Sequence, residues 1–138
     1  MPLISLAGRR PADLGPRDNR LKPCPSSPNC VCSDERDERH GLAAFRLARP
    51  AAQSWAAARL AVLALPRTRI VDERDGYLHA ECTSALLGFV DDLELQLREA
   101  EGSIAVRSAS RLGYRDFDVN RKRVESLRAV LRAGGAIR

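Results

Sequence analysis

Apolar and polar residues alternate along residues 77–111, and this period of two limits what the chain can fold into. The apolar residues that share one side are Leu78, Ala80 and Cys82, then Leu93, Leu95 and Leu97, then Ile104 and Val106. Successive side chains of a β-strand point to opposite faces of its sheet. These segments therefore predict antiparallel strands with one apolar face, one polar face and a cover on the apolar side only.

A helical pattern precedes these strands. Residues 51–65 lie between two prolines and place Trp55, Ala58, Val62 and Leu65 at helical spacing. Because proline is tolerated at a helix start and ends a helix elsewhere, this segment predicts a helix with Trp55 as a core anchor. The following "TRIVDER", residues 68–74, predicts a further strand.

A second helical pattern closes the chain. It runs from Asn120, a candidate N-cap, to Gly134 or Gly135 as the C-terminal stop. The order helix, strands, helix predicts an α+β fold, with an antiparallel sheet of about four strands and two helices packed on one face. We expect residues 1–22, which have no apolar period, to form a flexible N-terminal arm, and residues 23–138 to form a single α+β domain.

The positive charge of the chain comes almost entirely from arginine. The formal net charge is +5, and Lys22 and Lys122 are the only lysines. Binding of nucleic acid uses a continuous basic stripe or aromatic stacking platforms, and the few aromatic residues here are scattered, so we expect no nucleic-acid partner. No apolar run approaches the roughly 18 residues of a membrane helix, and the start lacks the basic-then-apolar order of a secretory signal. We therefore expect no membrane span and a cytoplasmic location.

Opposite charges are expected to face each other across the hairpin of residues 89–111. Keeping the leucines, Ile104 and Val106 on one face allows two registers. A four-residue loop sets Glu94 opposite Arg107, and a two-residue loop sets Asp92 opposite Arg111. Both registers predict a structural ion-pair lattice on a solvated polar face.

One carboxylate departs from this lattice. Asp91 has the parity of the apolar face, so its carboxylate must find hydrogen-bond donors there. Ser108 and Ser110 share the corresponding face of the next strand. We expect Asp91 to be hydrogen-bonded at that point, with a structural role.

The start of the last helix carries cations where the helix dipole favours anions. Arg121, Lys122 and Arg123 occupy its first turn. Two interpretations stay open. In one, the helix start and these arginines form an anion site toward which Arg107, Arg111 or Arg115 converge. In the other, which the general behaviour of ion networks favours, Asp116, Asp118 and Glu125 neutralise the cations, with Glu125 contacting Arg121 one turn away.

Four cysteines raise two further hypotheses. Cys24 and Cys30 flank "PSSPN", so a disulfide between them would close a tight loop, with Cys32 as an alternative partner. In a reducing cytoplasm we expect free thiols. Zinc binding by three cysteines and His40 is disfavoured by the spacing C-x5-C-x-C, and Cys82 has the parity of the core.

An enzyme is the other hypothesis. His79 and Glu81 share the polar face with Asp92 and Glu94, a set that suits acid–base chemistry or metal binding. The chain has no glycine-rich phosphate loop, nucleophile elbow or HExxH motif. We expect no cofactor and no metal.

Three segments together resemble a known family. In chain order, "LKPCPSSPNCVCS", "GFVDDLELQL" and "IAVRSASRLGYRDFDVNRKRVESLR" are similar to the motifs of the family called domain of unknown function 1499, over about residues 21–131. Cys32 and Arg115 depart from its pattern, which more often has serine and a small polar residue there. The resemblance implies no activity, and it implies that relatives are often exported, membrane-associated or plastid-located. The positions it singles out, without a role, are Cys24, Asn29, Cys30, Asp91, Asp92, Glu94, Arg107, Ser108, Ser110, Arg111, Tyr114, Asp116, Asn120, Arg121 and Arg123.

The leading hypothesis is a non-enzymatic module that binds a small anion or an acidic protein through an arginine-rich corner. Its candidate ligand-binding residues are Arg107, Arg111, Arg121, Arg123, Ser108, Ser110, Tyr114 and Asn120. The acids expected to hold them in place are Asp91, Asp92, Glu94 and Asp116. The alternatives are a hydrolase-type or metal-dependent enzyme using His79 and the carboxylates of the polar face, and a thiol redox role for Cys24 and Cys30.

Overall fold

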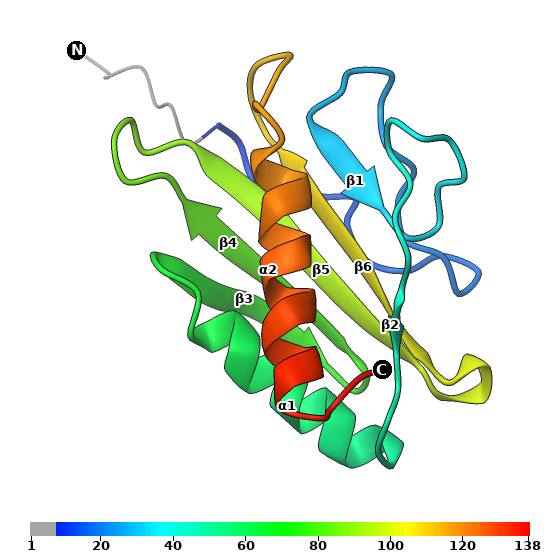
Figure 1. Cartoon of the computed structure of the whole chain (residues 1–138). Coiled ribbons are helices and arrows are strands. Elements are labelled where there is room, and N and C mark those ends of the chain that lie inside the picture. Colours follow the sequence, from blue (N-terminus) through cyan, green and yellow to red (C-terminus); the bar gives the residue numbers. More distant parts are fainter. Residues whose placement is uncertain (1–7) are drawn as a thin grey trace.

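A twisted antiparallel sheet organises the chain (Figure 1), which a computed structural model describes over residues 8–138. The elements in chain order are β1 (Cys30–Cys32), β2 (Phe45–Arg46), α1 (Ala51–Leu63), β3 (Thr68–Arg74), β4 (Tyr77–Thr83), β5 (Val90–Arg98), a 3-10 turn (Glu99–Glu101), β6 (Ser103–Ser110) and α2 (Val119–Ala133). The spatial order is β1-β6-β5-β4-β3. Strand β2 also pairs with β6, at residues 103–104, whereas β1 pairs with residues 107–109. The α+β class, the antiparallel sheet and the two helices are confirmed.

Two features of the predicted fold are wrong. The described chain has six strands rather than about four, and its order is strands, helix, strands, helix. The additional strands have three and two residues, too few to show an alternating pattern. They form because the outer edge of β6 offers unpaired backbone groups.

The register of the β5–β6 hairpin is the four-residue-loop alternative. Glu94 pairs with Arg107 and Leu95 with Val106, and residues 99–102 form the connection. Gly102 ends the 3-10 turn at φ 64°, a left-handed conformation that glycine adopts without a steric penalty. The alternation of apolar and polar residues that predicts the strands therefore also determines which of their side chains point into the core.

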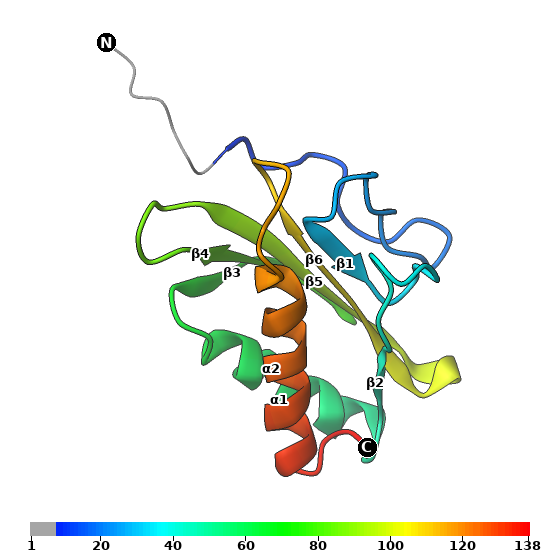
Figure 2. The same cartoon turned by 45° about the horizontal axis from the view of Figure 1, so that its top comes forward.

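Both helices pack on the apolar face of the sheet (Figure 2), and the core lies between them. From the sheet this core receives the alternating residues that the sequence predicted. From α1 it receives Ala58 and Val62, with Trp55 half-buried at its border, and from α2 it receives Val124, Leu127 and Leu131. Burying an aliphatic side chain is worth about 1.5–3 kcal/mol, so this face supplies the main driving force for folding.

The other face of the sheet is not solvated, contrary to our expectation. Alternation alone predicts that the polar residues of this face are exposed to solvent. They are instead buried: His79, Glu81, Asp92, Glu94, Gln96, Arg98 and Arg107. The N-terminal segment lies across them, on the side opposite the helices (Figure 2). The Gly15 N–H donates to Glu94 at 2.9 Å and Arg107 donates to the Lys22 carbonyl at 2.8 Å. Apolar periodicity gave no sign of this cover because it is held by hydrogen bonds and ion pairs.

Residues 8–22 therefore contact the sheet, whereas residues 1–7 of the predicted arm lie outside the described residues. The Asn19 side chain accepts a hydrogen bond from Gln96, and Leu21 packs in a small buried cluster with Tyr77 and Ala105. The division of the chain at residue 22 stays a prediction.

The start of α2 differs from the prediction. The helix begins at Val119 with Asp118 as its N-cap, and Asn120 lies inside the first turn with no exposure to solvent. Asp116 takes the capping role, because its carboxylate accepts hydrogen bonds from the Asn120 backbone N–H at 3.1 Å and from the Asp118 N–H at 3.0 Å. The end of α2 at Gly134 is as expected.

Candidate functional site

A buried ion network ties together the polar face. Arg111 donates two hydrogen bonds of 2.8 Å to Asp92 and also contacts Glu81. Arg10, from the N-terminal segment, also donates to Glu81, at 2.6 Å. The hydrogen bonds from Arg10 and Arg111 lower the pKa of Glu81 to about 2, although burial opposes this. This network has the character of a structural lattice.

His79 belongs to the same network. Its Nε2 lies 2.6 Å from Asp92, in a pair that is almost completely buried. Burial by itself raises a carboxyl pKa, but hydrogen bonds from Arg111 and His79 outweigh burial and the pKa of Asp92 is lowered. The structure thus brings together His79, Glu81 and Asp92, three of the four residues of the enzyme hypothesis, beneath the N-terminal segment.

The fourth residue, Glu94, has a separate set of partners. It is fully buried and accepts hydrogen bonds from the Tyr77 hydroxyl at 2.7 Å and the Gly15 N–H at 2.9 Å, with Arg107 at 3.5 Å. Burial and the adjacent Glu94 charge raise the pKa of Tyr77. Within residues 8–138, no group of three or more histidine, cysteine, aspartate or glutamate side chains is arranged to hold a metal ion.

Arg123 lies on the opposite face of the sheet from Arg107 and Arg111. It donates to Asp91 at 2.8 Å, to the Ser108 hydroxyl at 3.1 Å and to the Asn120 side chain at 2.8 Å. The inward carboxylate of Asp91 thus finds its donor in an arginine of α2 rather than in the serines that we expected.

Asn120 connects this cluster to the rest of the corner. Its amide donates to Ser110 at 2.9 Å and to Asp116 at 2.8 Å, and its oxygen accepts from the Ser108 hydroxyl at 2.7 Å. Every one of these polar groups is used inside the protein. Tyr114, in contrast, is exposed on the loop that follows β6.

Arg121 has a different set of partners. Its guanidinium donates to the backbone carbonyls of Gly41, Arg39 and Glu38 at 3.0–3.2 Å. Glu125 pairs with Arg128 at 2.8 Å rather than with Arg121. The structure therefore splits the four predicted arginines between two faces of the sheet and a loop, and does not bring them together in one site.

Cys24 and Cys30 are joined by a disulfide, with 5.6 Å between their Cα atoms. This differs from the free thiols that we expected from a cytoplasmic location. Cys32 and Cys82 are free and buried. Burial raises the pKa of Cys32 to about 11, which makes its thiol a poor nucleophile.

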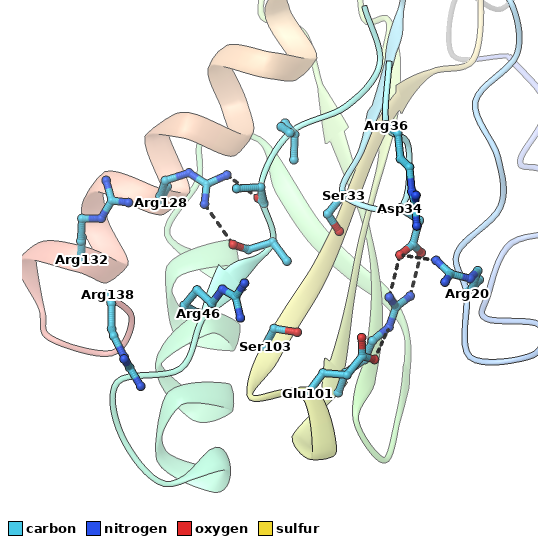
Figure 3. A pocket seen from close by; sticks show the side chains of 14 residues that line it. Arg20, Ser33, Asp34, Arg36, Arg46, Glu101, Ser103, Arg128, Arg132 and Arg138 are labelled. Carbon is cyan, nitrogen blue, oxygen red and sulfur yellow. Dashed lines mark hydrogen bonds and ion pairs between the residues drawn. The ribbon is translucent and has the colours of Figure 1, made fainter. Parts of the chain in front are cut away.

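A second group of arginines surrounds a pocket of about 450 Å³ between the end of α2, β2 and the β5–β6 hairpin. The charged residues of its lining are Arg20, Arg36, Arg46, Arg98, Arg128, Arg132, Arg138, Asp34 and Glu101. Figure 3 shows Arg46, Arg132 and Arg138 on one side, Arg20, Arg36 and Asp34 on the other, and the hydroxyls of Ser33 and Ser103 between them. With seven arginines against two acids, the lining has a formal charge of +5.

The carboxylates of this pocket are already occupied. Asp34 receives two hydrogen bonds from Arg98, at 2.6 and 2.7 Å, and a third from the Leu21 N–H at 2.9 Å. Burial is the largest influence on Asp34, yet these donors outweigh it and its pKa is lowered. Glu101 lies 4.0 Å from the same arginine.

Several cations of the pocket have no such partner. Among residues 8–138, the guanidinium groups of Arg36, Arg46 and Arg132 donate no hydrogen bond to a protein group and form no ion pair. The guanidinium of Arg128 is fixed nearby, because it donates to the carbonyl of Ala43 at 2.6 Å and lies over the Phe45 ring. The pocket thus combines free positive charge with a rigid wall.

No pattern in the sequence indicates this pocket. Its arginines come from the N-terminal segment, the loop after β1, β2, the end of β5, α2 and residue 138, so no local stretch collects them. The one local signal is Arg132 in the last turn of α2, which the helix dipole alone explains.

The fold and these sites define an α+β protein with an antiparallel sheet, two helices on one face and an ion-paired N-terminal segment on the other. The sequence profile of the family described as "Protein of unknown function (DUF1499)" matches residues 20–131. The chain belongs to this family, as the resemblance predicted. Neither the curated proteins nor the solved structures contain a significant match to it. Neither helix within residues 8–138 has the length and hydropathy that a bilayer crossing requires.

Proposed function

We propose that this protein binds a small, multiply charged anion in the arginine pocket, without chemical conversion. One observation carries the proposal: Arg36, Arg46 and Arg132 face the pocket without a carboxylate partner among residues 8–138, while Asp34 is held by Arg98. Planar guanidinium groups bind phosphate and carboxylate oxygens with paired hydrogen bonds. An anion between them would relieve the mutual repulsion of the arginines and supply acceptors for their N–H groups.

The hydroxyls of the pocket support an oxyanion ligand. Ser33 uses its oxygen to accept from the Val106 N–H at 2.9 Å, which leaves its hydroxyl hydrogen to donate. Ser103 has only 8% of its surface exposed, and its hydroxyl has no partner within residues 8–138. Two donors between the two groups of arginines suit a ligand with oxygens on several sides, such as a phosphorylated or polycarboxylate compound.

The lining favours binding over catalysis. It contains neither histidine nor cysteine nor lysine, and its two carboxylates are Asp34 and Glu101. Since the pKa of Asp34 is lowered, its carboxylate stays ionised and is a weak general base near neutral pH.

Calorimetric titration with inorganic pyrophosphate, and separately with citrate, tests the proposal at low salt. We expect saturable binding that Arg46→Gln and Arg132→Gln each weaken about tenfold or more, because a hydrogen bond to a charged group is worth about 1.5–3 kcal/mol. Arg115→Gln is the matched control, since Arg115 is exposed but lies outside the lining. Absence of binding, or equal affinity of all variants, contradicts the proposal.

The corner of the sequence hypothesis is tested in the same titration. Arg121→Ala should leave the affinity unchanged, because Arg121 already donates to three backbone carbonyls. A loss with Arg121→Ala but not with Arg132→Gln would instead favour an anion site at the start of α2.

A thiol redox role is the second candidate, supported by the Cys24–Cys30 disulfide. Cys24 is half-buried at the border of the polar face, and Cys30 is fully buried. Measuring the reduction potential of the pair against a glutathione buffer tests it. A potential near that of the buffer would support exchange, and a much lower one would indicate a structural bond.

A further inference from the structure

Exposed apolar side chains gather on two loops at one end of the molecule. The loop of residues 84–89 joins β4 to β5, and the loop of residues 111–118 joins β6 to α2; we call them together the loop tip. Of the large apolar residues that the described chain exposes, most lie here: Leu86, Leu87, Phe89, Leu112, Tyr114, Phe117 and, at the start of α2, Val119. Leu86 and Phe117 are the most exposed, at 90% and 85%.

The two loops are neighbours in space. They enclose a pocket of about 250 Å³ whose apolar lining includes Phe89, Leu112, Phe117 and Val119. The Arg111 N–H donates to the Val90 carbonyl at 3.4 Å where the loops leave the sheet. Figures 1 and 2 both show them where α2 begins, whereas the arginine pocket lies where α2 ends. Residues from both loops therefore surround one pocket, separate from the proposed anion site.

The exposure of Phe117 is fixed by its own backbone. Phe117 has φ 53° and Asp118 φ 63°, left-handed conformations that are costly for residues with a side chain. Asp116 stabilises them, since its carboxylate accepts from the N–H groups of Asp118 and Asn120. The loop thus holds the ring of Phe117 at the exposed rim of the apolar pocket.

Cations surround this apolar surface. Arg115 lies in the loop tip, Arg9 directly follows Gly8, which lies against Leu112, and Arg67 donates to the Thr83 carbonyl at the base of the first loop. None of the three forms an ion pair within residues 8–138. Asp116 is engaged in hydrogen bonds, which leaves Asp118 as the exposed acid of the tip. The balance of free charge around the apolar side chains is positive.

The N-terminal segment approaches the loop tip at Gly8. Gly8 lies against Leu112, so closely that a Cβ on it would be 3.1 Å from the Leu112 side chain.

We propose that the loop tip binds the surface of an anionic lipid bilayer, with Leu86 and Phe117 entering the headgroup boundary. Apolar side chains that project separately from two loops can each insert into a fluid lipid interface, whereas a protein partner would need a surface of complementary shape. A tyrosine beside aliphatic residues is typical of the interfacial zone, and unpaired arginines are attracted by anionic headgroups. This binding is independent of the proposed anion site, because the two lie at opposite ends of α2.

Co-sedimentation of the full chain with vesicles tests this inference. The probes are vesicles of phosphatidylcholine alone and of phosphatidylcholine mixed with phosphatidylglycerol. We expect binding to the mixed vesicles, weaker binding to the neutral ones, and a decrease with added salt. Leu86→Asp combined with Phe117→Asp should lower the apparent partition coefficient by about tenfold or more, because both side chains lose their apolar contact with lipid.

A matched variant tests whether vesicle binding requires the loop tip rather than any exposed apolar side chain. Leu60 on α1 has 65% of its surface exposed and lies away from the loops, so Leu60→Asp should bind like the unchanged protein. Arg67→Gln combined with Arg115→Gln should reduce the preference for the anionic vesicles. Thermal unfolding followed by circular dichroism checks that each variant is folded.

Three outcomes would overturn the inference. The unchanged protein fails to sediment with the mixed vesicles, or the tip variant binds them as well as the unchanged protein does. In the third, a dimer forms in solution without lipid and Leu86→Asp with Phe117→Asp abolishes it, which identifies a second copy of the chain as the occupant.

Discussion

The arginines of the sheet and those of the pocket differ in what faces them. Arg107, Arg111 and Arg123 are largely buried, and each contacts at least one carboxylate: Glu94, Asp92 or Asp91. Arg46 and Arg132 are exposed and face a cavity. Arginines buried against a carboxylate thus stabilise the fold, whereas exposed arginines without a carboxylate partner are free to bind.

This difference shows that local density of arginine in a sequence does not locate free positive charge. Of the six cations in residues 107–123, Arg107, Arg111 and Arg123 each pair with an acid of β5, 13–32 positions away in the sequence. The pocket draws its arginines from distant segments, and three of them, Arg36, Arg46 and Arg132, have no acid partner within residues 8–138. Partners, which only the tertiary structure defines, determine whether an arginine stabilises the fold or is free to bind.

Removing a buried arginine gives the largest effect. Arg111→Met should lower the free energy of unfolding by about 3–5 kcal/mol, the usual result when one member of a buried ion pair is lost. Urea unfolding followed by circular dichroism measures it. Arg115→Met is the matched control, with an expected change within about 0.5 kcal/mol. A loss below about 1 kcal/mol for Arg111→Met would mean that the network is not structural.

The acid side of the network should show in the pH dependence of stability. The pKa of Glu81 is about 2 in the folded chain and 4.5 by reference, so its contribution is complete above pH 4.5 and is lost as the pH falls toward 2. Glu81→Gln should therefore cost about 1.5–3 kcal/mol at neutral pH, the size of a charged hydrogen bond. The difference from the unchanged protein should shrink in acid. Urea midpoints at several pH values measure this, and a constant difference contradicts it.

The Cys24–Cys30 disulfide should contribute about as much to the free energy of unfolding as the Glu81 carboxylate does. Closing a loop of seven residues removes about 2 kcal/mol of unfolded-chain entropy, so Cys24→Ser with Cys30→Ser should lower stability by that amount. A reducing agent should have the same effect on the unchanged protein and none on the variant. If reductant leaves the urea midpoint of the unchanged protein where it was, the bond does not contribute.

The pocket arginines should give the smallest effect. Arg132→Gln is expected to change the free energy of unfolding by no more than about 0.5 kcal/mol, because no group of residues 8–138 depends on this side chain. The same urea experiment measures it. A loss above about 1 kcal/mol would place Arg132 with the structural arginines and would remove the contrast between the two groups.

The helices and the central strands could be predicted because their signals are local. The strands of residues 68–74 and 77–83 have the predicted bounds, and α1 lies between the two prolines that the sequence places around it. The register of the hairpin was limited to two choices by the parity of the leucines. Side-chain direction in a strand depends only on position along the chain, so no knowledge of packing was needed.

The site could not be predicted in the same way. The acid network was expected on the polar face, but its cover by residues 8–22 was not, because that segment has no periodic pattern. Arg123 was expected to bind a ligand, and within the protein it forms an ion pair with Asp91. Which acceptor an arginine meets depends on the path of several segments at once.

The sequence by itself determined the α+β class, the strand faces, the core of alternating apolar residues and the family, because each of these depends on local order. Only the tertiary structure decided which arginines are neutralised, what covers the polar face, and that Arg46 and Arg132 share a pocket with Arg36. Charges act through distance in space rather than along the chain. Their effects were fixed only when the sheet brought remote segments together.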